Sequence, residues 1–160
     1  MEDRIWNGLA NIKFRSVYTA KVSRRSHNIG NGYSFFLSFA SASSVAAWAV
    51  WEAAPYFWAC IVAVSQVLHI AKPYLPYSKG SRDFIEMSLL YEAIVLEYEK
   101  LWYDNRKEAR NEELLEKRYN NLRQKEHNVD KRFKHVVCPE FKGLINKADV
   151  ETNNFLNNNF

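Results

Sequence analysis

The sequence predicts an all-α protein in which two helices form a hairpin across a membrane. Within residues 26–71 the only Asp, Glu, Lys or Arg is Glu52, whereas charged residues crowd into the segments on either side. The chain contains five Trp, nine Tyr and ten Phe, and such an aromatic-rich composition argues against disorder. No segment alternates polar and apolar residues convincingly at every second position, as a half-buried strand would.

Residues 1–32 are expected to form a cytosolic amphipathic helix that ends in a turn. Ile5, Leu9 and Ile12 fall roughly on one side of such a helix. The segment 28–32, Asn-Ile-Gly-Asn-Gly, should break it because Gly and Asn favour turn conformations. The basic residues lie elsewhere on the helix and are candidates for binding lipid headgroups: Lys13, Arg15, Lys21, Arg24 and Arg25.

Residues 33–72 are interpreted as the transmembrane hairpin. The apolar runs 33–51 and 53–71 each approach the roughly 20 residues that cross the hydrocarbon layer, and a turn from Glu52 to Pro55 joins them. Trp and Tyr cluster near the expected ends of the spans, where amphipathic rings prefer the headgroup level. Basic residues flank the hairpin but are absent from its turn. The positive-inside rule therefore predicts a multi-pass protein of the cell inner membrane with both termini in the cytoplasm.

The first apolar run is only weakly hydrophobic because it contains several serines. Its small residues lie four apart, a spacing that allows membrane helices to approach closely, and the candidates for helix packing are Ser34, Ser38, Ala42 and Ala46. In the alternative interpretation, the two runs are core helices of a soluble bundle. This would require helices that are apolar on nearly all sides, and a chain of 160 residues has too little sequence to cover them.

From Ser81 the pattern changes to charged helices over residues 81–150. Apolar residues recur at steps of three and four along the first of these helices, a heptad-like pattern typical of a packed or coiled-coil stripe. The stripe would pack on the N-terminal helix, on another subunit of a homo-oligomer, or on both. Its candidate oligomer contacts are Phe84, Met87, Tyr91, Ile94, Tyr98 and Trp102. Further helices are expected from Asn111 and from Pro139, and residues 151–160 are expected to be a flexible tail.

Polar residues within membrane spans are the usual candidates for function. Ser65, Gln66 and His69 lie in the last turns of the second run and are candidate pore-lining residues, since His titrates near neutral pH. The alternative is that they form hydrogen bonds between helices or reach the headgroups. Glu52 is either part of a selectivity ring in an oligomer or a hydrated turn residue.

The sequence carries no catalytic motif that we recognise, and we do not expect an enzyme. It contains no Gly-rich phosphate loop, no HExxH and no GxSxG motif. Its two cysteines, Cys60 and Cys138, are far apart and lack the spacing of a zinc site. No metal or cofactor is therefore expected. The tail interleaves acidic with basic residues, so nucleic acid is not an expected partner.

Three segments carry a resemblance to a known family. They are KFRSVYTAKVSRRSHNIGN (13–31), VSQVLHIAKPYLPYSKGSRDF (64–84) and LLYEAIVLEYEKLWYDNR (89–106). In their order and pattern the chain resembles the SLATT domain, a bacterial two-span membrane module, over roughly residues 10–155. The resemblance implies an oligomeric effector of antiviral defence that perturbs the membrane or forms a pore. It also implies activation by a separate sensor protein or a nucleotide second messenger. The alternative is a non-conducting membrane adaptor whose helical tail recruits a cytosolic partner.

Overall fold

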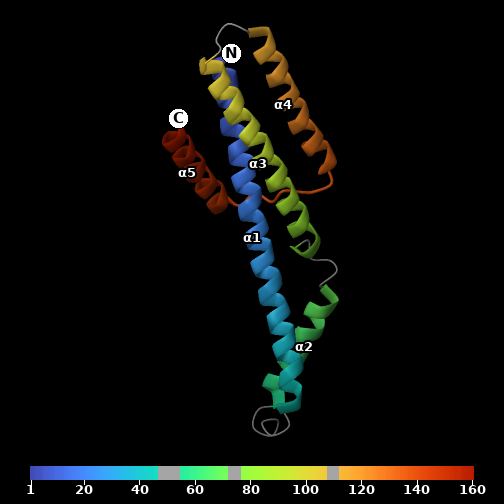
Figure 1. The fold of residues 1–160 in the computed structure, drawn as a ribbon. Helices are drawn as coiled ribbons and strands as arrows, with labels where there is room; N and C mark the ends of the chain where they lie inside the picture. The colour runs from blue at the N-terminus through green and yellow to red at the C-terminus, as the bar shows by residue number, and fades with distance from the viewer. Residues whose placement is uncertain (47–54, 72–76, 108–111) are drawn as a thin grey trace. The chain divides into compact units, whose positions relative to one another are not determined.

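The described part of the protein is entirely helical. The structure is a computed structural model that describes residues 1–46, 55–71, 77–107 and 112–160, and no strand occurs among them. The predicted all-α class is therefore confirmed for this part of the chain. The helices, in chain order (Figure 1), are α1 (Glu2–Ala46), α2 (Pro55–Ala71), α3 (Tyr77–Lys107), α4 (Glu112–Arg132) and α5 (Lys142–Asn159).

The helix α1 is one continuous helix of 45 residues, so the predicted break over residues 28–32 does not occur. Among the described residues, no glycine or other residue has a positive φ. Gly in a helix costs about 1 kcal/mol relative to Ala, which weakens a helix without ending it. Asn31 Nδ2 also lies 3.1 Å from Nε2 of His27, one turn earlier. This side-chain contact supports the helix at the point where the sequence suggested a turn.

The chain forms two compact units that differ from the domain boundaries expected from the sequence. The first unit comprises residues 1–24 together with 81–160, and the second comprises residues 25–80. The beginning of α1 thus belongs with the C-terminal helices, whereas the sequence had suggested a separate helical domain over residues 1–32. The reason is that the apolar face of this segment is complementary to faces of helices far along the chain, and local periodicity does not reveal such partners.

In the first unit, α1 and α3 run antiparallel and are joined by hydrogen bonds from small residues. Ser16 Oγ donates to the Ser88 carbonyl oxygen at 3.2 Å. One heptad further along α1, Ser23 Oγ donates to the Ser81 carbonyl oxygen at 3.1 Å. Because serine side chains are short, these bonds require the two helix backbones to lie close together.

Gly8 marks another close approach of α1 and α3. A Cβ atom on this residue would lie only 2.8 Å from Cε1 of Tyr98, well inside the usual separation of non-bonded carbon atoms, which is about 3.5–4.0 Å. Tyr98 is fully buried, and its hydroxyl donates to Glu126 Oε1 at 2.7 Å. The ring is thus held against the helix, and only glycine leaves enough room for it.

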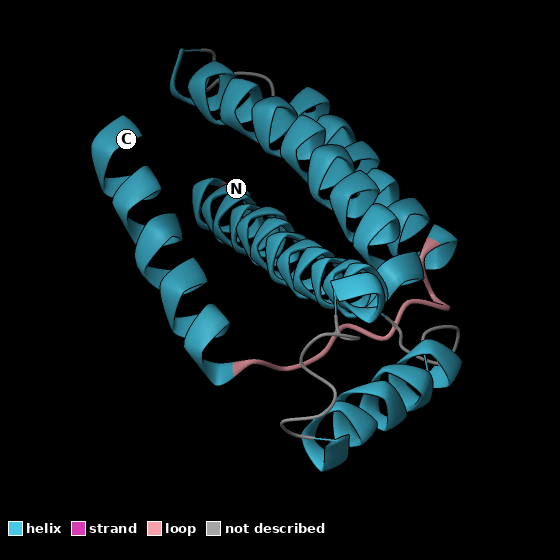
Figure 2. Cartoon of the chain, turned by 90° about the horizontal axis from the view of Figure 1, so that it is seen from below, coloured by secondary structure: helices cyan, strands magenta, loops and turns pink. Residues whose placement is uncertain are grey.

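Two more helices complete the first unit. α4 runs antiparallel to α3, as shown by the ion pairs Lys125–Glu97 at 2.6 Å and Arg118–Asp104 at 2.8 Å. Within this unit, α1 lies between α5 and the α3–α4 pair (Figures 1 and 2). The hydrophobic core lies between these helices and includes Ile5, Leu9, Ile12, Val22, Val95, Tyr98, Leu101, Leu115, Leu122, Ala148 and Leu156.

The last helix also differs from the prediction. The segment 151–160, expected to be a flexible tail, is helical up to Asn159. Leu156 is buried, and the ring of Phe160 lies 5.8 Å from that of Trp6. The asparagines of this segment suggested a frayed end, but they are on its exposed side. The partner of its apolar side is the start of the chain, which the local pattern does not indicate.

Candidate functional site

The second unit contains the candidate functional site, which is a pair of helices formed by the end of α1 and by α2. The Tyr33 hydroxyl donates to the Leu68 carbonyl oxygen and so links the two helices. Leu68 belongs to the last turn of α2, where backbone carbonyls lack partners within the helix. The tyrosine therefore satisfies an acceptor that would be costly to leave unpaired in an apolar environment.

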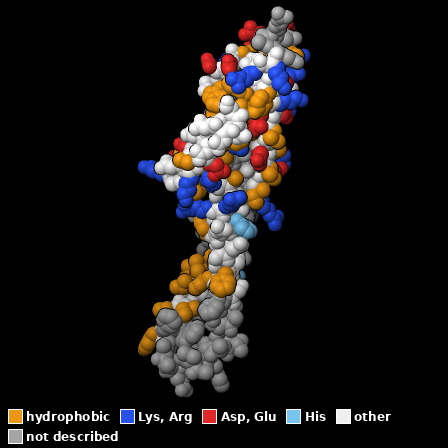
Figure 3. All heavy atoms as spheres, turned by 60° about the vertical axis from the view of Figure 1, so that its left-hand side comes forward, with side chains coloured by type: hydrophobic (Ala, Val, Ile, Leu, Met, Phe, Trp, Pro, Cys, Tyr) orange, Lys and Arg blue, Asp and Glu red, His pale blue; other side chains and the backbone are white. Residues whose placement is uncertain are grey.

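Large apolar side chains of this unit are exposed. Phe35 of α1 is 74% exposed, and Val67 and Ile70 of α2 are 66% and 67% exposed. Figure 3 shows apolar side chains gathered on this unit. Its described residues from 26 to 46 and from 55 to 71 contain no Asp, Glu, Lys or Arg. An exposed apolar surface of this kind is typical of a site that contacts a membrane or a protein partner.

Within the described residues, no single helix is both long enough and apolar enough to cross a bilayer. The predicted spans, 33–51 and 53–71, both include part of the segment 47–54, which lies outside the described residues. Glu52, predicted to be a turn residue or part of a selectivity ring, lies in that segment as well.

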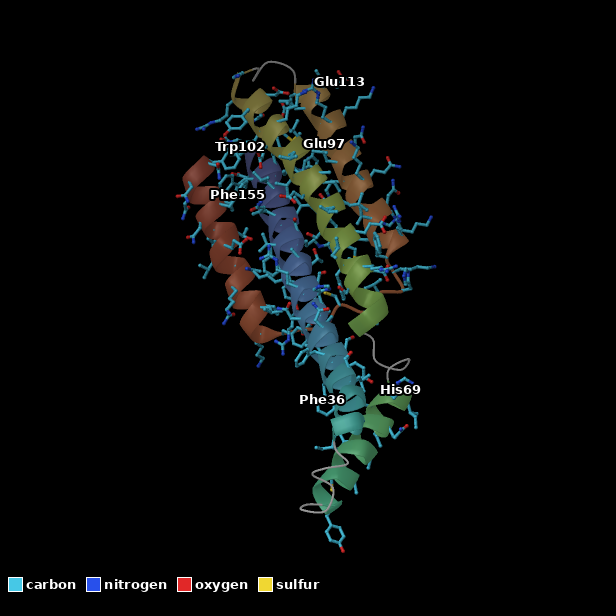
Figure 4. All side chains as sticks on the ribbon, turned by 60° about the horizontal axis from the view of Figure 1, so that its bottom comes forward. Phe36, His69, Glu97, Trp102, Glu113 and Phe155 are labelled. Carbon is cyan, nitrogen blue, oxygen red and sulfur yellow. The ribbon has the colours of Figure 1, made fainter. Side chains whose placement is uncertain are left out.

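The predicted polar residues of α2 have different surroundings. Ser65 Oγ donates to the Ile61 carbonyl oxygen at 2.8 Å, a bond to its own helix that lowers the cost of a serine in an apolar environment. Gln66 and His69 are exposed, and Figure 4 shows His69 projecting from α2. Because residues three apart on a helix are neighbours, Gln66 and His69 form one polar patch, while Ser65 turns to its own backbone.

Of the predicted packing residues of α1, only Ser34 and Ser38 have described side chains. These two do not pack against another helix of the described chain. Ser38 Oγ donates to the Ser34 carbonyl oxygen at 2.9 Å, and both residues are exposed. Ala42 and Ala46 belong to α1, but their side chains lie outside the described part. Packing of these residues against another subunit stays a prediction.

Two of the basic residues predicted to bind lipid headgroups have partners on α5. The Nζ atom of Lys13 lies 4.0 Å from the centre of the Phe155 ring, and Lys21 forms an ion pair with Glu151. The sequence did not indicate these contacts because the partners follow more than a hundred residues later. Arg24 and Arg25, the last two residues of the predicted set, are exposed.

A third residue of that set, Arg15, takes part in a polar cluster between three helices. Its Nη1 atom lies 3.0 Å from both carboxylate oxygens of Asp130 on α4. The Tyr91 hydroxyl of α3 donates to the same carboxylate at 2.6 Å. The charge of Arg15 is thus engaged by a carboxylate of the chain itself, and its predicted binding to headgroups stays a prediction. The cluster ties α1, α3 and α4 together, and the sequence analysis missed it.

A second carboxylate, one turn earlier on α4, repeats the arrangement. Glu126 is buried and accepts hydrogen bonds from the Tyr98 hydroxyl at 2.7 Å and from Arg123 at 2.8 Å. Burial, together with the bonds to these carboxylates, raises the pKa of both Tyr91 and Tyr98 well above the ordinary value. Both phenols therefore remain protonated donors at neutral pH. Tyr91 and Tyr98 are seven residues apart on α3, and Glu126 and Asp130 are four residues apart on α4. This spacing is the only signal of the pairing in the sequence.

The predicted oligomer contacts of α3 are buried within the chain. Phe84, Met87, Tyr91, Ile94, Tyr98 and Trp102 are all at most 9% exposed. These residues pack inside the first unit, which agrees with the alternative that the stripe packs on the N-terminal helix. In this conformation they are not available to a second subunit. The opposite face of α3 also carries exposed apolar residues at heptad-like spacing, namely Ile85, Leu89, Leu96 and Tyr103.

No reactive centre is evident in the described part of the chain. A groove of about 410 Å³ between α3 and α4 is lined by Lys100, Asp104 and Arg118 among other residues, but Arg118 and Asp104 are already paired. No three His, Cys, Asp or Glu side chains among the described residues come together as metal ligands. Both cysteines are free and exposed, with Cys60 in the second unit and Cys138 in the first.

The chain was compared with known proteins, and it matches no family model, no curated protein and no solved structure.

Proposed function

We propose that the chain is a membrane protein whose α1–α2 hairpin inserts into the bacterial inner membrane and, as an oligomer, makes that membrane permeable. In this proposal both termini are cytoplasmic. The resemblance to the SLATT domain extends the proposal to an antiviral defence effector that responds to a separate sensor protein or nucleotide signal. The effector acts by rearranging helices in the lipid, so it needs no covalent chemistry and no cofactor.

The exposed apolar surface of the second unit is the observation that carries the proposal. Phe35, Val67 and Ile70 are each about two-thirds exposed or more, on a hairpin whose described residues carry no formal charge. In water this surface would favour aggregation, whereas in lipid its burial is favourable by about 25 cal/mol per Å². The hydrogen bond from Tyr33 to the Leu68 carbonyl also suits a medium without water, where each backbone acceptor needs a partner.

Dye release from lipid vesicles tests the proposal. Full-length protein should release a trapped dye, and Val64→Asp on the exposed surface of α2 should prevent both insertion and release. An aspartate near the centre of a span costs about 2.5–3.5 kcal/mol. Val150→Asp is the matched control, because Val150 is also an exposed valine on a helix (60% against 51% for Val64) but lies in the first unit. Equal release by both variants would contradict the proposal.

The polar patch of Gln66 and His69 gives a second prediction. Gln66→Leu together with His69→Leu should leave insertion intact and reduce dye release and growth arrest on induction, because the patch would line the conducting path. Ser65→Ala is the control, since its hydroxyl already bonds to its own helix. If the double variant arrests growth as fully as the parent, the patch has no role in conduction, and the membrane assignment is unaffected.

A second candidate function is a non-conducting membrane adaptor, and the outer face of α3 favours it. Ile85, Leu89 and Leu96 are 48%, 61% and 61% exposed and would form a contact surface for a cytosolic partner helix. The same vesicle experiment separates the two functions. An adaptor inserts and leaves the vesicles intact, whereas an effector inserts and releases the dye.

A further inference from the structure

The first unit includes α1 only up to residue 24, and three other helices meet α1 at the end where it leaves the unit. The bond from Ser23 to the Ser81 carbonyl brings the start of α3 to this end. The Tyr18 hydroxyl accepts a hydrogen bond at 3.2 Å from the backbone N–H of Phe141, the residue before α5, so α5 begins near this end as well. Helix α4 ends there, since it runs antiparallel to α3.

Four exposed basic residues gather at this end, and we call them the basic end face: Arg24, Arg82, Lys134 and Lys142. None of the four forms an ion pair with another residue that the structure describes. Figure 3 shows Lys and Arg side chains at this end of the first unit. These four charges are therefore available to a partner outside the chain.

The acidic residues at this end do not balance the basic ones. Glu86 is already paired with Arg132, and Asp83 Oδ2 lies 3.7 Å from Nε2 of His135. Within the segments 81–86 and 133–142, the only other acidic residue is Glu140. The basic end face thus keeps a net positive charge.

Helix stability does not explain where these charges lie. Both α3 and α5 begin at this end, and neither has an acidic residue in its first turn. Lys142 is the first residue of α5, where a positive charge opposes the helix dipole. The helices α1 and α4 begin at the opposite end of the unit, and each has two acidic residues in its first turn. The basic end face therefore departs from the charge pattern at the opposite end.

The helix α1 runs from the basic end face into the hairpin without a break. Its residues 26–32 contain no Asp, Glu, Lys or Arg and include two Asn and two Gly. At 1.5 Å per residue they span about 10 Å, whereas the headgroup layer on each side of a bilayer is about 5–8 Å thick. If the helix enters the hydrocarbon at Tyr33, residues 26–32 cross the headgroup layer and the basic end face meets its outer boundary.

We propose that the basic end face binds the anionic headgroups of the bilayer into which the hairpin inserts. This inference rests on the proposed membrane function and names the lipid class that the inserted chain prefers. Side chains on a helix lean toward its N-terminus, so Arg82 and Lys142, near the starts of their helices, lean out of this end. The sequence alone indicated only Arg24 of the four, because contacts between distant segments bring the others beside α1.

The lipid preference of the full-length protein in reconstituted vesicles tests the inference. The vesicles contain phosphatidylcholine and a smaller share of phosphatidylglycerol, and electron spin resonance compares the association of spin-labelled forms of the two lipids with the protein. The parent protein should prefer phosphatidylglycerol. This preference should fall when the salt is raised from about 0.1 M to about 1 M, because the Debye length shortens from about 10 Å to about 3 Å. Equal association of the two lipids overturns the inference.

Two double variants of equal net charge sharpen the test. Each basic residue near an anionic surface favours binding by a factor of about five, so Arg82→Gln with Lys142→Gln should lose most of the preference. The matched control is Lys107→Gln with Lys117→Gln, which removes two exposed charges at the opposite end of the unit and should keep it. Hydrogen exchange of the α3 amides around Tyr98 checks that both variants are folded. Equal preferences of the two variants overturn the inference.

Extraction of the vesicles with alkaline buffer separates failure of this inference from failure of the proposed function. A chain that resists extraction but shows no lipid preference is inserted, and only the role of the basic end face fails. A chain that is extracted, and that needs Arg82 and Lys142 to bind vesicles with phosphatidylglycerol, binds headgroups without inserting, so the proposed function fails instead. A chain that binds no vesicles, with or without phosphatidylglycerol, contradicts both.

Discussion

Replacement of Gly8 by alanine tests the tight contact between α1 and α3. A Cβ atom at this position would lie 2.8 Å from Cε1 and 3.0 Å from Cζ of Tyr98. The ring has little freedom to move, since Tyr98 is fully buried and its hydroxyl is bonded to Glu126. We expect Gly8→Ala to push the helices apart or to break the bond to Glu126, and so to destabilise the first unit.

The size of the effect follows from two opposing contributions. Overpacking a well-packed core costs about 1–3 kcal/mol, and alanine in place of glycine within a helix gains about 1 kcal/mol. Gly30→Ala is the matched reference on the same helix, because a Cβ at Gly30 meets no atom within 4 Å. The helix gain is common to both variants, so the free energies of opening around the two sites should change by amounts that differ by about 1–3 kcal/mol.

Hydrogen exchange of the α1 amides around each site measures these free energies in the full-length protein. A double-mutant cycle with Tyr98→Leu completes the test, because leucine lacks the Cε1 and Cζ atoms that would meet the new methyl group. In that background Gly8→Ala should stabilise α1, as Gly30→Ala does. If Gly8→Ala alone already stabilises α1, the close approach of the two helices is not a constraint and the reasoning is refuted.

Two further predictions concern tyrosine hydroxyls. Because the native pKa values of Tyr91 and Tyr98 are raised, their contribution to stability is fully present below the unfolded pKa of about 10 and is lost as the pH rises through the native values, by about 1.4 kcal/mol per pH unit for each group. Urea unfolding at pH 9 and pH 11 should show this loss, and the Tyr91→Phe and Tyr98→Phe variants should each lack part of it; an unchanged pH dependence would argue against the buried bonds. In the second unit, Tyr33→Phe should weaken the hairpin by about 1 kcal/mol, the net value of one hydrogen bond, as measured by exchange of amides at the end of α2. Tyr56→Phe should have no effect, because Tyr56 is 87% exposed, and equal effects of the two variants would show that the bond to Leu68 is unimportant.

The helical class and the buried face of α3 could be predicted because both depend on local periodicity. Residues such as Tyr91 and Tyr98 recur at helical steps, and they are buried as a packed stripe requires. The same pattern could not distinguish a partner within the chain from a second subunit, since any apolar surface satisfies it. For this reason the sequence alone left both partners open for this stripe, and its residues are buried within the chain.

The contacts between distant segments could not be predicted from one sequence. Arg15 pairs with Asp130, and Lys21 pairs with Glu151, although more than a hundred residues separate the partners in each pair. Basic residues that seemed available for lipid headgroups therefore have acidic partners within the chain. The break predicted over residues 28–32 failed for a different reason. Glycine and asparagine lower helix stability by amounts that a long, continuous helix can absorb.

The two exposed cysteines give the molecule its own pair of chemical labels, one in each unit. In the unfolded chain, a water-soluble maleimide has access to both thiols. If the hairpin inserts into lipid as proposed, the acyl chains should shield Cys60, while Cys138 should stay in water. The ratio of the two adducts in a mass spectrum would therefore test the proposed insertion with the native sequence unchanged.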